Sequence, residues 1–352
     1  MPPGSIFIPS RVTTRLNLTS RPGRNDYIFT LQLCHAQYDG PSLFNILSDI
    51  TSLYQAPSSL PPTSTVSFSR YLQASRVSRA NGCLDFWKEY LAGSSGLTAV
   101  CPSAIVETNG HSPHNTVQEA SGALPPSYVT FPTLVNAAIA LCLGNLTKTR
   151  DVNFARVMSS RDVLATADLF CPSPQHDPQA ELVGPCINRT LLRVQLPEVD
   201  STSALEFCRQ LRDIQARASG EGHLSLADVL ESSTDWLPPS SGTLAAKKLL
   251  KEAPFITHLP ADTATPSFHL SEDLDVAWKS TDVRIDPGNQ VLVRSATSTV
   301  DNGVDACIQV QTSDTVLNSE DALALAAHIL KILQLLSVAP EVLVRDILLE
   351  KV

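Results

Sequence analysis

The chain has 352 residues, a net charge of −9, 43% hydrophobic residues and 17% charged residues. This length predicts about two domains with a substantial core, and the apolar content excludes a mostly disordered chain. The acidic balance argues against a nucleic-acid or membrane-surface protein, because such proteins need a basic surface. We identify no apolar run of the ~18–20 residues that cross a bilayer and no secretion signal, so we expect a cytoplasmic protein.

Eight cysteines are spread along the chain. None forms a CxxC pair, and no histidine lies at zinc-finger spacing from two of them. Most occur in apolar stretches, which favours buried, reduced thiols over a disulfide framework.

The first predicted element is a short apolar strand, residues 27–33, which ends at the loop CHAQYDG. Pro41 then suits the first turn of a helix whose apolar stripe continues to residue 53. After a Pro/Ser connector, residues 67–93 are expected to form one or two amphipathic helices that end at Gly93. A polar stretch at 104–126 is the best candidate for a linker between domains.

The second half of the sequence alternates helical and strand patterns. We expect helices at 133–147, 203–219 and 319–337, the last with Ser319 as its N-cap, and strands at 151–158 and 191–196. Residues 162–180 are expected to be a loop, and 232–302 to be irregular with short strands. The alternation predicts an α/β or α+β layered fold, with residues 1–103 in one lobe and 127–352 in another.

The most specific chemical feature is His35-x-x-x-Asp39-Gly40 at the end of the predicted strand. An imidazole mounted on a loop after a buried strand can take a proton from a hydroxyl or amine nucleophile. Asp39 is expected to orient the turn and Gly40 to free its backbone. Cys34 adjoins the histidine but should point to the opposite face of the strand, so we interpret it as a packing residue. By itself, however, HxxxDG also fits a histidine that merely follows a strand.

This segment, CHAQYDG, resembles the HHxxxDG motif of the condensation domains of nonribosomal peptide synthetases. It is most similar to the fungal terminal type, in which a small residue replaces the first histidine. Other segments resemble the same family in the same order: SFSRYLQ, DFWKEYLAG, FPTLVNAAIALCLGNLTKTRDVNFARVMSSRD, ELVGPCINRTLLRVQL and GHLSLADVLE. Several separated motifs in order are much more specific than HxxxDG alone.

The resemblance implies two chloramphenicol-acetyltransferase-like lobes in a V, with a tunnel between them. Carrier domains would present thioester-linked substrates on phosphopantetheine arms, and no cofactor or metal would be bound directly. His35 would be the base or orienting group, Asp39 a structural partner and Gly40 the backbone hinge. The resemblance also implies an amide- or ester-forming acyltransferase, and in the terminal type often a macrocyclising release.

Three further residues are candidates near this site. Arg161, at the end of a predicted strand, is a candidate ion-pair partner for Asp39, because a lone buried carboxylate is costly; it could equally be a solvated residue at the start of a loop. Gly184 and Asn188 are candidates for a loop beneath the tunnel, or for a turn in which the Asn side chain binds its own backbone. His223, His258 and Trp87 are interpreted as surface or packing residues.

The sequence departs from the family at its front, where only 34 residues precede His35. A piece on the order of a hundred residues is expected there, so the first lobe is incomplete and should leave a sheet edge and an apolar face uncovered. Three explanations of this difference remain open: a truncated sequence, a split protein completed by another chain, and a degenerate remnant. One functional alternative is a non-catalytic fragment that binds carrier domains. Another is an acyl-CoA transferase, which is less favoured because the DFGWG motif of plant acyltransferases is absent.

Overall fold

The computed structural model of the protein describes residues 14–20, 23, 27–34, 36–58, 67–80, 83–100, 115–124, 127–161, 182–197, 200–221, 224–238, 242–260, 289–300 and 303–349. Internal contacts divide the chain into two units. Unit 1 comprises residues 1–72, 170–186 and 268–277, and unit 2 comprises the remainder. We describe each unit by itself.

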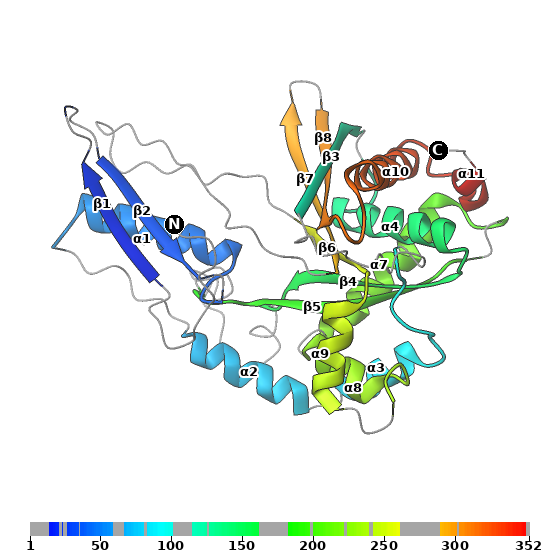
Figure 1. Cartoon of the computed structure of the whole chain (residues 1–352), viewed down its shortest axis with the longest axis horizontal. Helices are drawn as coiled ribbons and strands as arrows, with labels where there is room; N and C mark the ends of the chain where they lie inside the picture. Colours follow the sequence, from blue (N-terminus) through cyan, green and yellow to red (C-terminus); the bar gives the residue numbers. More distant parts are fainter. Residues whose placement is uncertain are drawn as a thin grey trace. The chain divides into compact units, whose positions relative to one another are not determined.

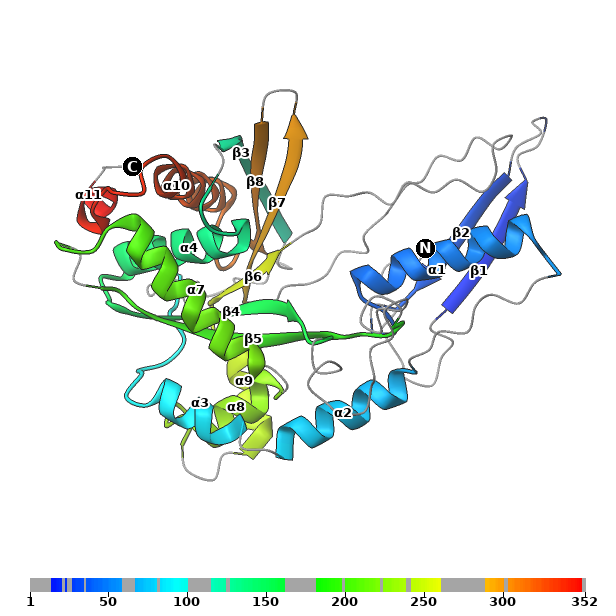
Figure 2. The same ribbon diagram turned by 180° about the vertical axis from the view of Figure 1, so that it is seen from behind.

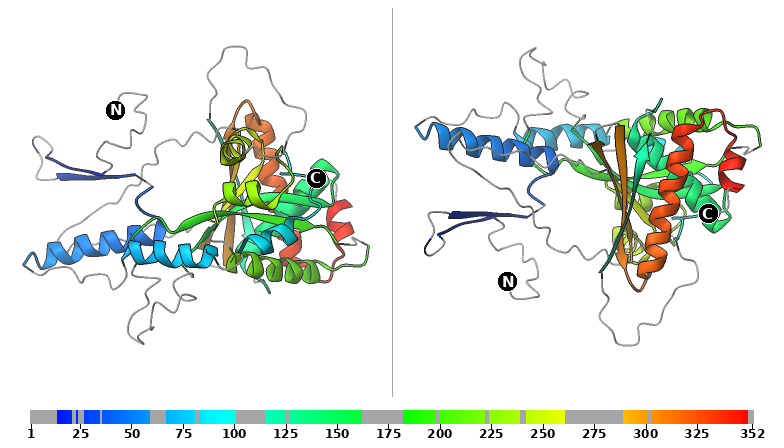
Figure 3. Two further views of the ribbon diagram at one scale, coloured as in Figure 1. Left: turned by 90° about the horizontal axis from the view of Figure 1, so that it is seen from below. Right: turned by 90° about the horizontal axis from the view of Figure 1, so that it is seen from above.

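Unit 1 contains an antiparallel hairpin of β1 (Thr14–Ser20) and β2 (Tyr27–Leu33), helix α1 (Gly40–Gln55) and the start of α2 (Phe68–Ala80). Strand β2 and helix α1 confirm the elements predicted on either side of the CHAQYDG loop. Strand β1 was not expected. Figure 3 shows the hairpin in dark blue, edge-on, as a single thin layer.

Unit 2 is built on a six-stranded mixed sheet with the order β3-β8-β7-β6-β4-β5. Strand β6 pairs in parallel with β4 and with β7, and the other pairs are antiparallel. The sheet twists visibly from β3 to β5 (Figure 1). Its strands are β3 (Asn115–Leu124), β4 (Asp151–Ser159), β5 (Ile187–Gln195), β6 (Ile256–Pro260), β7 (Val291–Val300) and β8 (Gly303–Ser313).

Helices cover both faces of this sheet (Figures 1 and 2). Because successive side chains of a strand point to opposite faces, Val152 and Phe154 of β4 join one core while Ala155 joins the other. The larger core receives α4 (Phe131–Thr147), α7 (Ala204–Gly220), α10 (Ser319–Val338) and α11 (Val344–Leu349). The smaller core receives α3 (Cys83–Leu91), α8 (Leu226–Ser233) and α9 (Gly242–Glu252).

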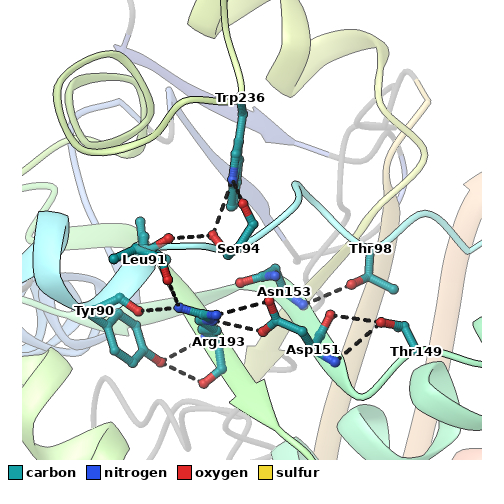
Figure 4. Close-up of polar contacts among 10 residues, drawn as sticks. Tyr90, Leu91, Ser94, Thr98, Thr149, Asp151, Asn153, Arg193 and Trp236 are labelled. Carbon is teal, nitrogen blue, oxygen red and sulfur yellow. Dashed lines mark hydrogen bonds and ion pairs between the residues drawn. The ribbon is translucent and has the colours of Figure 1, made fainter.

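One arginine fastens α3 to the sheet (Figure 4). The guanidinium of Arg193 on β5 donates to both carboxylate oxygens of Asp151 at 2.8 and 3.1 Å, and to the carbonyl oxygens of Tyr90 and Ala92 at 2.9 and 2.8 Å. The Tyr90 hydroxyl donates to the Arg193 carbonyl oxygen at 2.8 Å. A two-pronged arginine–carboxylate pair with these further acceptors fixes the end of the helix in one orientation. Burial raises the pKa of Tyr90 to about 12, so its hydroxyl stays a donor.

Several expectations are corrected by the structure. Residues 115–124, which were assigned to a linker, form strand β3, while the predicted lobe boundaries stay predictions. The stretch expected to be irregular contains helix α9. The N-cap of α10 is Asn318 rather than Ser319, because the Asn318 side-chain oxygen accepts from the Asp321 amide at 2.9 Å.

Helix α10 also differs from the expectation that no run is long and apolar enough to span a bilayer. With 20 residues, it is long and apolar enough to cross a membrane by length and composition alone. Half of its most apolar window is buried within the protein, against β3, β8 and α4. Its apolar residues are therefore explained by packing in the larger core of unit 2.

Candidate active site at the end of strand β2

Asp39 of the HxxxDG loop is the N-cap of helix α1. Its carboxylate is fully buried, and Oδ1 accepts a hydrogen bond from the backbone N–H of Ser42 at 3.0 Å. The Ser42 hydroxyl donates to the same oxygen at 2.5 Å. An aspartate at this position satisfies amides that the first helical turn leaves unpaired, and its charge is favourable at a helix N-terminus.

The second carboxylate oxygen binds a segment far away in sequence. Oδ2 of Asp39 accepts from the backbone N–H of Cys186 at 3.2 Å. The Ser42 hydroxyl oxygen accepts from the Gly184 N–H at 3.0 Å and lies 2.9 Å from the Gly184 carbonyl oxygen. Asp39 and Ser42 therefore join the start of α1 to residues 184–186, and we call this group the Asp39 clamp. All of it lies in unit 1.

Gly184 is required by close packing rather than by an unusual backbone angle. A Cβ atom added there would lie 2.2 Å from Cδ2 of Phe68. The Phe68 ring is in turn stacked on Tyr71, with centroids 5.4 Å apart. The motif glycine thus lets an aromatic ring lie directly on the backbone of the clamp.

We expect Gly184→Ala to lower the free energy of local opening around residue 184 by about 1–3 kcal/mol, because Phe68 must move away from its stacked position. The matched control is Gly40→Ala, since a Cβ at Gly40 would meet nothing within 4 Å. Hydrogen exchange of residues 182–187 measures the effect. Equal exchange in both variants would show that the ring does not restrain Gly184.

The loop that carries His35 is bracketed by described residues, while His35 itself lies outside them. The N–H of Gln37 donates to the Cys34 carbonyl oxygen at 2.9 Å, which closes a tight turn before Asp39. Gly40 opens α1 without a left-handed backbone angle. Its place beside the site stays a prediction, as does the catalytic role of His35.

Arg161 and Asn188 belong to unit 2. The Arg161 side chain is buried, which contradicts the alternative of a solvated loop residue; its pairing with Asp39 stays a prediction. The Asn188 amide donates to the Leu224 carbonyl oxygen at 2.7 Å, and its side-chain oxygen accepts from the Arg189 N–H at 2.9 Å. Asn188 therefore binds the backbone before α8 and the amide of its neighbour Arg189. Its place in a loop beneath the tunnel stays a prediction.

His223 lies outside the described residues, whereas His258 is buried, which agrees with a packing residue. The Nδ1 atom of His258 lies 2.7 Å from the side-chain oxygen of Asn136, and its Nε2 atom lies 2.8 Å from the Ser295 hydroxyl. Because the amide oxygen only accepts, Nδ1 carries the proton and Nε2 accepts from Ser295. Burial, and secondarily the charge of Arg156, lower the pKa of His258 from 6.5 to about 3.

This depressed pKa predicts acid sensitivity of unit 2. The unfolded chain takes up a proton near pH 6.5 and the folded one near pH 3, so stability is intact above pH 6.5 and falls by about 1.4 kcal/mol per pH unit below it. Urea unfolding followed by tryptophan fluorescence at pH 7, 6 and 5 measures this slope, and His258→Gln should reduce it. An unchanged slope in the variant would mean that other groups cause the loss.

The described cysteines are free thiols, as expected: Cys34, Cys83, Cys142, Cys186, Cys208 and Cys307. Burial raises the pKa of Cys142 and of Cys208 to about 12, so both remain protonated and unreactive. Trp87 is core, 1% exposed, and its indole N–H donates to the Glu221 carbonyl oxygen at 3.0 Å. Among the residues that the structure describes, no group of three His, Cys, Asp or Glu side chains is arranged to hold a metal ion.

Sequence reasoning missed Ser42, Cys186 and Phe68 as parts of the site. Ser42 had a readable signal, because an aspartate three residues before a serine, ahead of an apolar helical stripe, is a capping pattern. Cys186 contributes only its backbone N–H, and Phe68 only its ring against a glycine, so neither could be identified from residue type.

Comparisons with known proteins place this geometry in context. No protein-family model matches the sequence. The nonribosomal peptide synthetase penN of Penicillium thymicola is 47% identical over 335 residues, which cover 95% of this chain and 11% of that protein. The nonribosomal peptide synthetase asqK of Emericella nidulans is 44% identical over 320 residues, 88% of this chain and 11% of that protein. The chain thus spans about a tenth of the length of these relatives.

Solved structures agree with the sequence relatives. The crystal structure of CT is 27% identical, with a TM-score of 0.73, and the match covers 95% of this chain and 68% of that one. The structure of holo T3CT matches with 26% identity and a TM-score of 0.72, covering 92% and 67%. The starter condensation domain of rhizomide synthetase shares the fold at 12% identity, with a TM-score of 0.61 and coverage of 90% and 68%. The chain is therefore homologous to a segment of fungal nonribosomal peptide synthetases and has the fold of their condensation domains.

Proposed function

We propose that the chain acts as a condensation domain of the fungal terminal type. It would form an amide or ester bond from a peptidyl thioester held on the phosphopantetheine arm of a carrier domain. The product would be released from the arm, in the cyclising form through a nucleophile of the same peptide.

One observation carries this proposal. The Asp39 clamp joins the HxxxDG loop to residues 184–186, so two segments that independently resemble the condensation family are bonded to one another. A histidine that merely followed a strand would need no such support. A buried carboxylate whose oxygens accept three hydrogen bonds is instead typical of a loop held in one conformation for chemistry.

The proposed reaction needs little chemical machinery beyond position. A thioester is already activated, so His35 would accept the proton of the attacking amine or hydroxyl while the nucleophile adds to the carbonyl carbon. The carbon–sulfur bond then breaks, and the phosphopantetheine thiolate takes up the proton. No covalent enzyme intermediate is required.

The partners in this proposal are carrier domains and, within a larger synthetase, neighbouring modules. The relatives penN and asqK are synthetases about nine times longer than the matched region, and a solved neighbour is described as holo T3CT. A cytoplasmic location would suit such an assembly.

The test is an assay with one peptidyl mimic presented in two forms, loaded on a carrier domain and as a CoA thioester. Product from the carrier-bound form, detected by mass spectrometry, supports the proposal. Equal rates from both forms would instead favour an acyl-CoA transferase. Carrier binding without product would favour the non-catalytic fragment.

A further inference from the structure

A surface cavity of unit 2 lies where helix α3, strand β5 and the last turn of α7 meet. Its volume is about 330 Å³, which is at the lower end of the range for pockets that hold small molecules. The side chains that line it include Phe86, Glu89, Tyr90, Arg193, Gln195 and Arg217. Aromatic rings and arginines thus surround a space large enough for a small organic ligand.

One wall of the cavity is aromatic. Phe86 and Tyr90 are one helical turn apart on α3, and their rings are stacked, with centroids 5.5 Å apart and an angle of 14° between the planes. The guanidinium carbon of Arg217 lies 5.8 Å from the centre of the Phe86 ring, which is a cation–π distance. Because aromatic rings attract one another both face to face with an offset and edge to face, this wall can hold a further ring.

The positive charge of Arg217 is not balanced by an ion pair. None of the ion pairs between described residues involves this guanidinium, although Glu89 also lines the cavity. The charge of Arg193, by contrast, is balanced by the Asp151 carboxylate (Figure 4). Arg217 therefore keeps its N–H donors available for an anion in the cavity.

A second arginine without an ion pair lies close to this wall. Arg156 on β4 is only 8% exposed, and its buried Nε has no hydrogen-bond partner among the described residues. Its Nη2 donates to the Gln215 carbonyl oxygen at 3.0 Å and to the Ser219 hydroxyl at 2.9 Å. Burial raises the pKa of Tyr90, whereas hydrogen bonding to Arg193 and the charge of Arg156 lower it. The field of Arg156 thus reaches the cavity wall, and because a buried charge without a counterion is costly, an anion there is favoured.

We propose that this cavity binds a small aromatic carboxylate. The aromatic wall would hold the ring, and Arg217 would receive the carboxylate, because a guanidinium matches a carboxylate in shape as well as in charge. The side-chain amide of Gln195, the last residue of β5, can donate to the same group. A neutral aromatic compound would lack the attraction to the arginines, and an aliphatic carboxylate would lack the contact with the rings.

Binding of benzoate to the full chain, measured by isothermal titration calorimetry, tests the proposal. Benzamide, which has the ring without the charge, and acetate, which has the charge without the ring, are the comparison ligands. We expect benzoate to bind about tenfold or more tightly than either. The cavity belongs to unit 2 and His35 to unit 1, so His35→Ala should bind benzoate unchanged. The result is therefore independent of the proposed catalysis.

Two arginines of α7 provide a matched pair of variants. Arg217→Gln removes the guanidinium of the cavity and should weaken benzoate binding about tenfold. Arg212→Gln removes an exposed guanidinium that pairs with Asp213 and should change the affinity within about twofold. Because both side chains are exposed, neither variant should change the circular dichroism of the chain. Equal affinities for benzoate and benzamide, equal effects of the two variants, or no binding of benzoate would each overturn the proposal.

Discussion

Replacing Asp39 with alanine is expected to release the start of α1 from residues 184–186. The substitution removes the acceptor for three donors: the Ser42 N–H, the Ser42 hydroxyl and the Cys186 N–H. Leaving a buried donor unpaired costs about 1–3 kcal/mol, and losing an N-cap costs about 1 kcal/mol. We therefore expect the free energy of local opening to fall by about 3–5 kcal/mol.

Hydrogen exchange measures this opening segment by segment. Residues 40–47 and 182–187 should exchange about a hundredfold faster or more in Asp39→Ala, because 3 kcal/mol is more than two factors of ten. Asp39→Asn should be intermediate, since its amide oxygen can still accept from Ser42 while its NH₂ group faces the Cys186 N–H donor.

The matched control is Asp49→Ala, which removes a carboxylate from the same helix but not from its N-cap. Its exchange should resemble that of the unmodified chain in both segments. If Asp39→Ala opened residues 40–47 but left 182–187 protected, the carboxylate would serve the helix alone, and the clamp would not join the two motifs.

The sequence predicted those elements that local patterns determine. Helices α4, α7 and α10 were identified because their apolar residues recur at helical spacing, and β2 because a short apolar run precedes a loop. Strand β3 was missed because it is a polar edge strand, and its identity depends on pairing with β8, far along the chain. Long-range pairing overrides local composition in such cases.

The sequence identified the motif residues of the site but not the hydrogen bonds that join them. Asp39 and Gly184 were both singled out, yet the sequence offered an arginine as the partner of the carboxylate. The structure shows that the backbone amides of Cys186 and Ser42 also bind this carboxylate, while its pairing with Arg161 stays a prediction. Because every residue except proline has a backbone amide, residue types do not indicate which amides a carboxylate binds. This contact therefore could not be predicted, although the segments around Asp39 and Gly184 were both identified.

Replacement of His35 with alanine is expected to lower the rate of product formation by roughly 10²–10⁴-fold, the usual contribution of a general base. In the carrier-loaded assay, carrier affinity should stay within about twofold, because the change removes a proton acceptor and not a docking surface. His223→Ala is the matched control, a histidine from another family-like segment that we interpret as non-catalytic, and its rate should also stay within about twofold.

The comparison between His35→Ala and Asp39→Ala separates chemistry from position. If His35 relays the proton, its removal should abolish the limb of the pH–rate profile that reports the base while hydrogen exchange of residues 40–47 remains unchanged. Asp39→Ala should slow the reaction and accelerate exchange together, since it acts through the clamp. Full activity of His35→Ala on a carrier-bound substrate would show that position alone drives attack on the thioester, and the motif would then be a scaffold without a base.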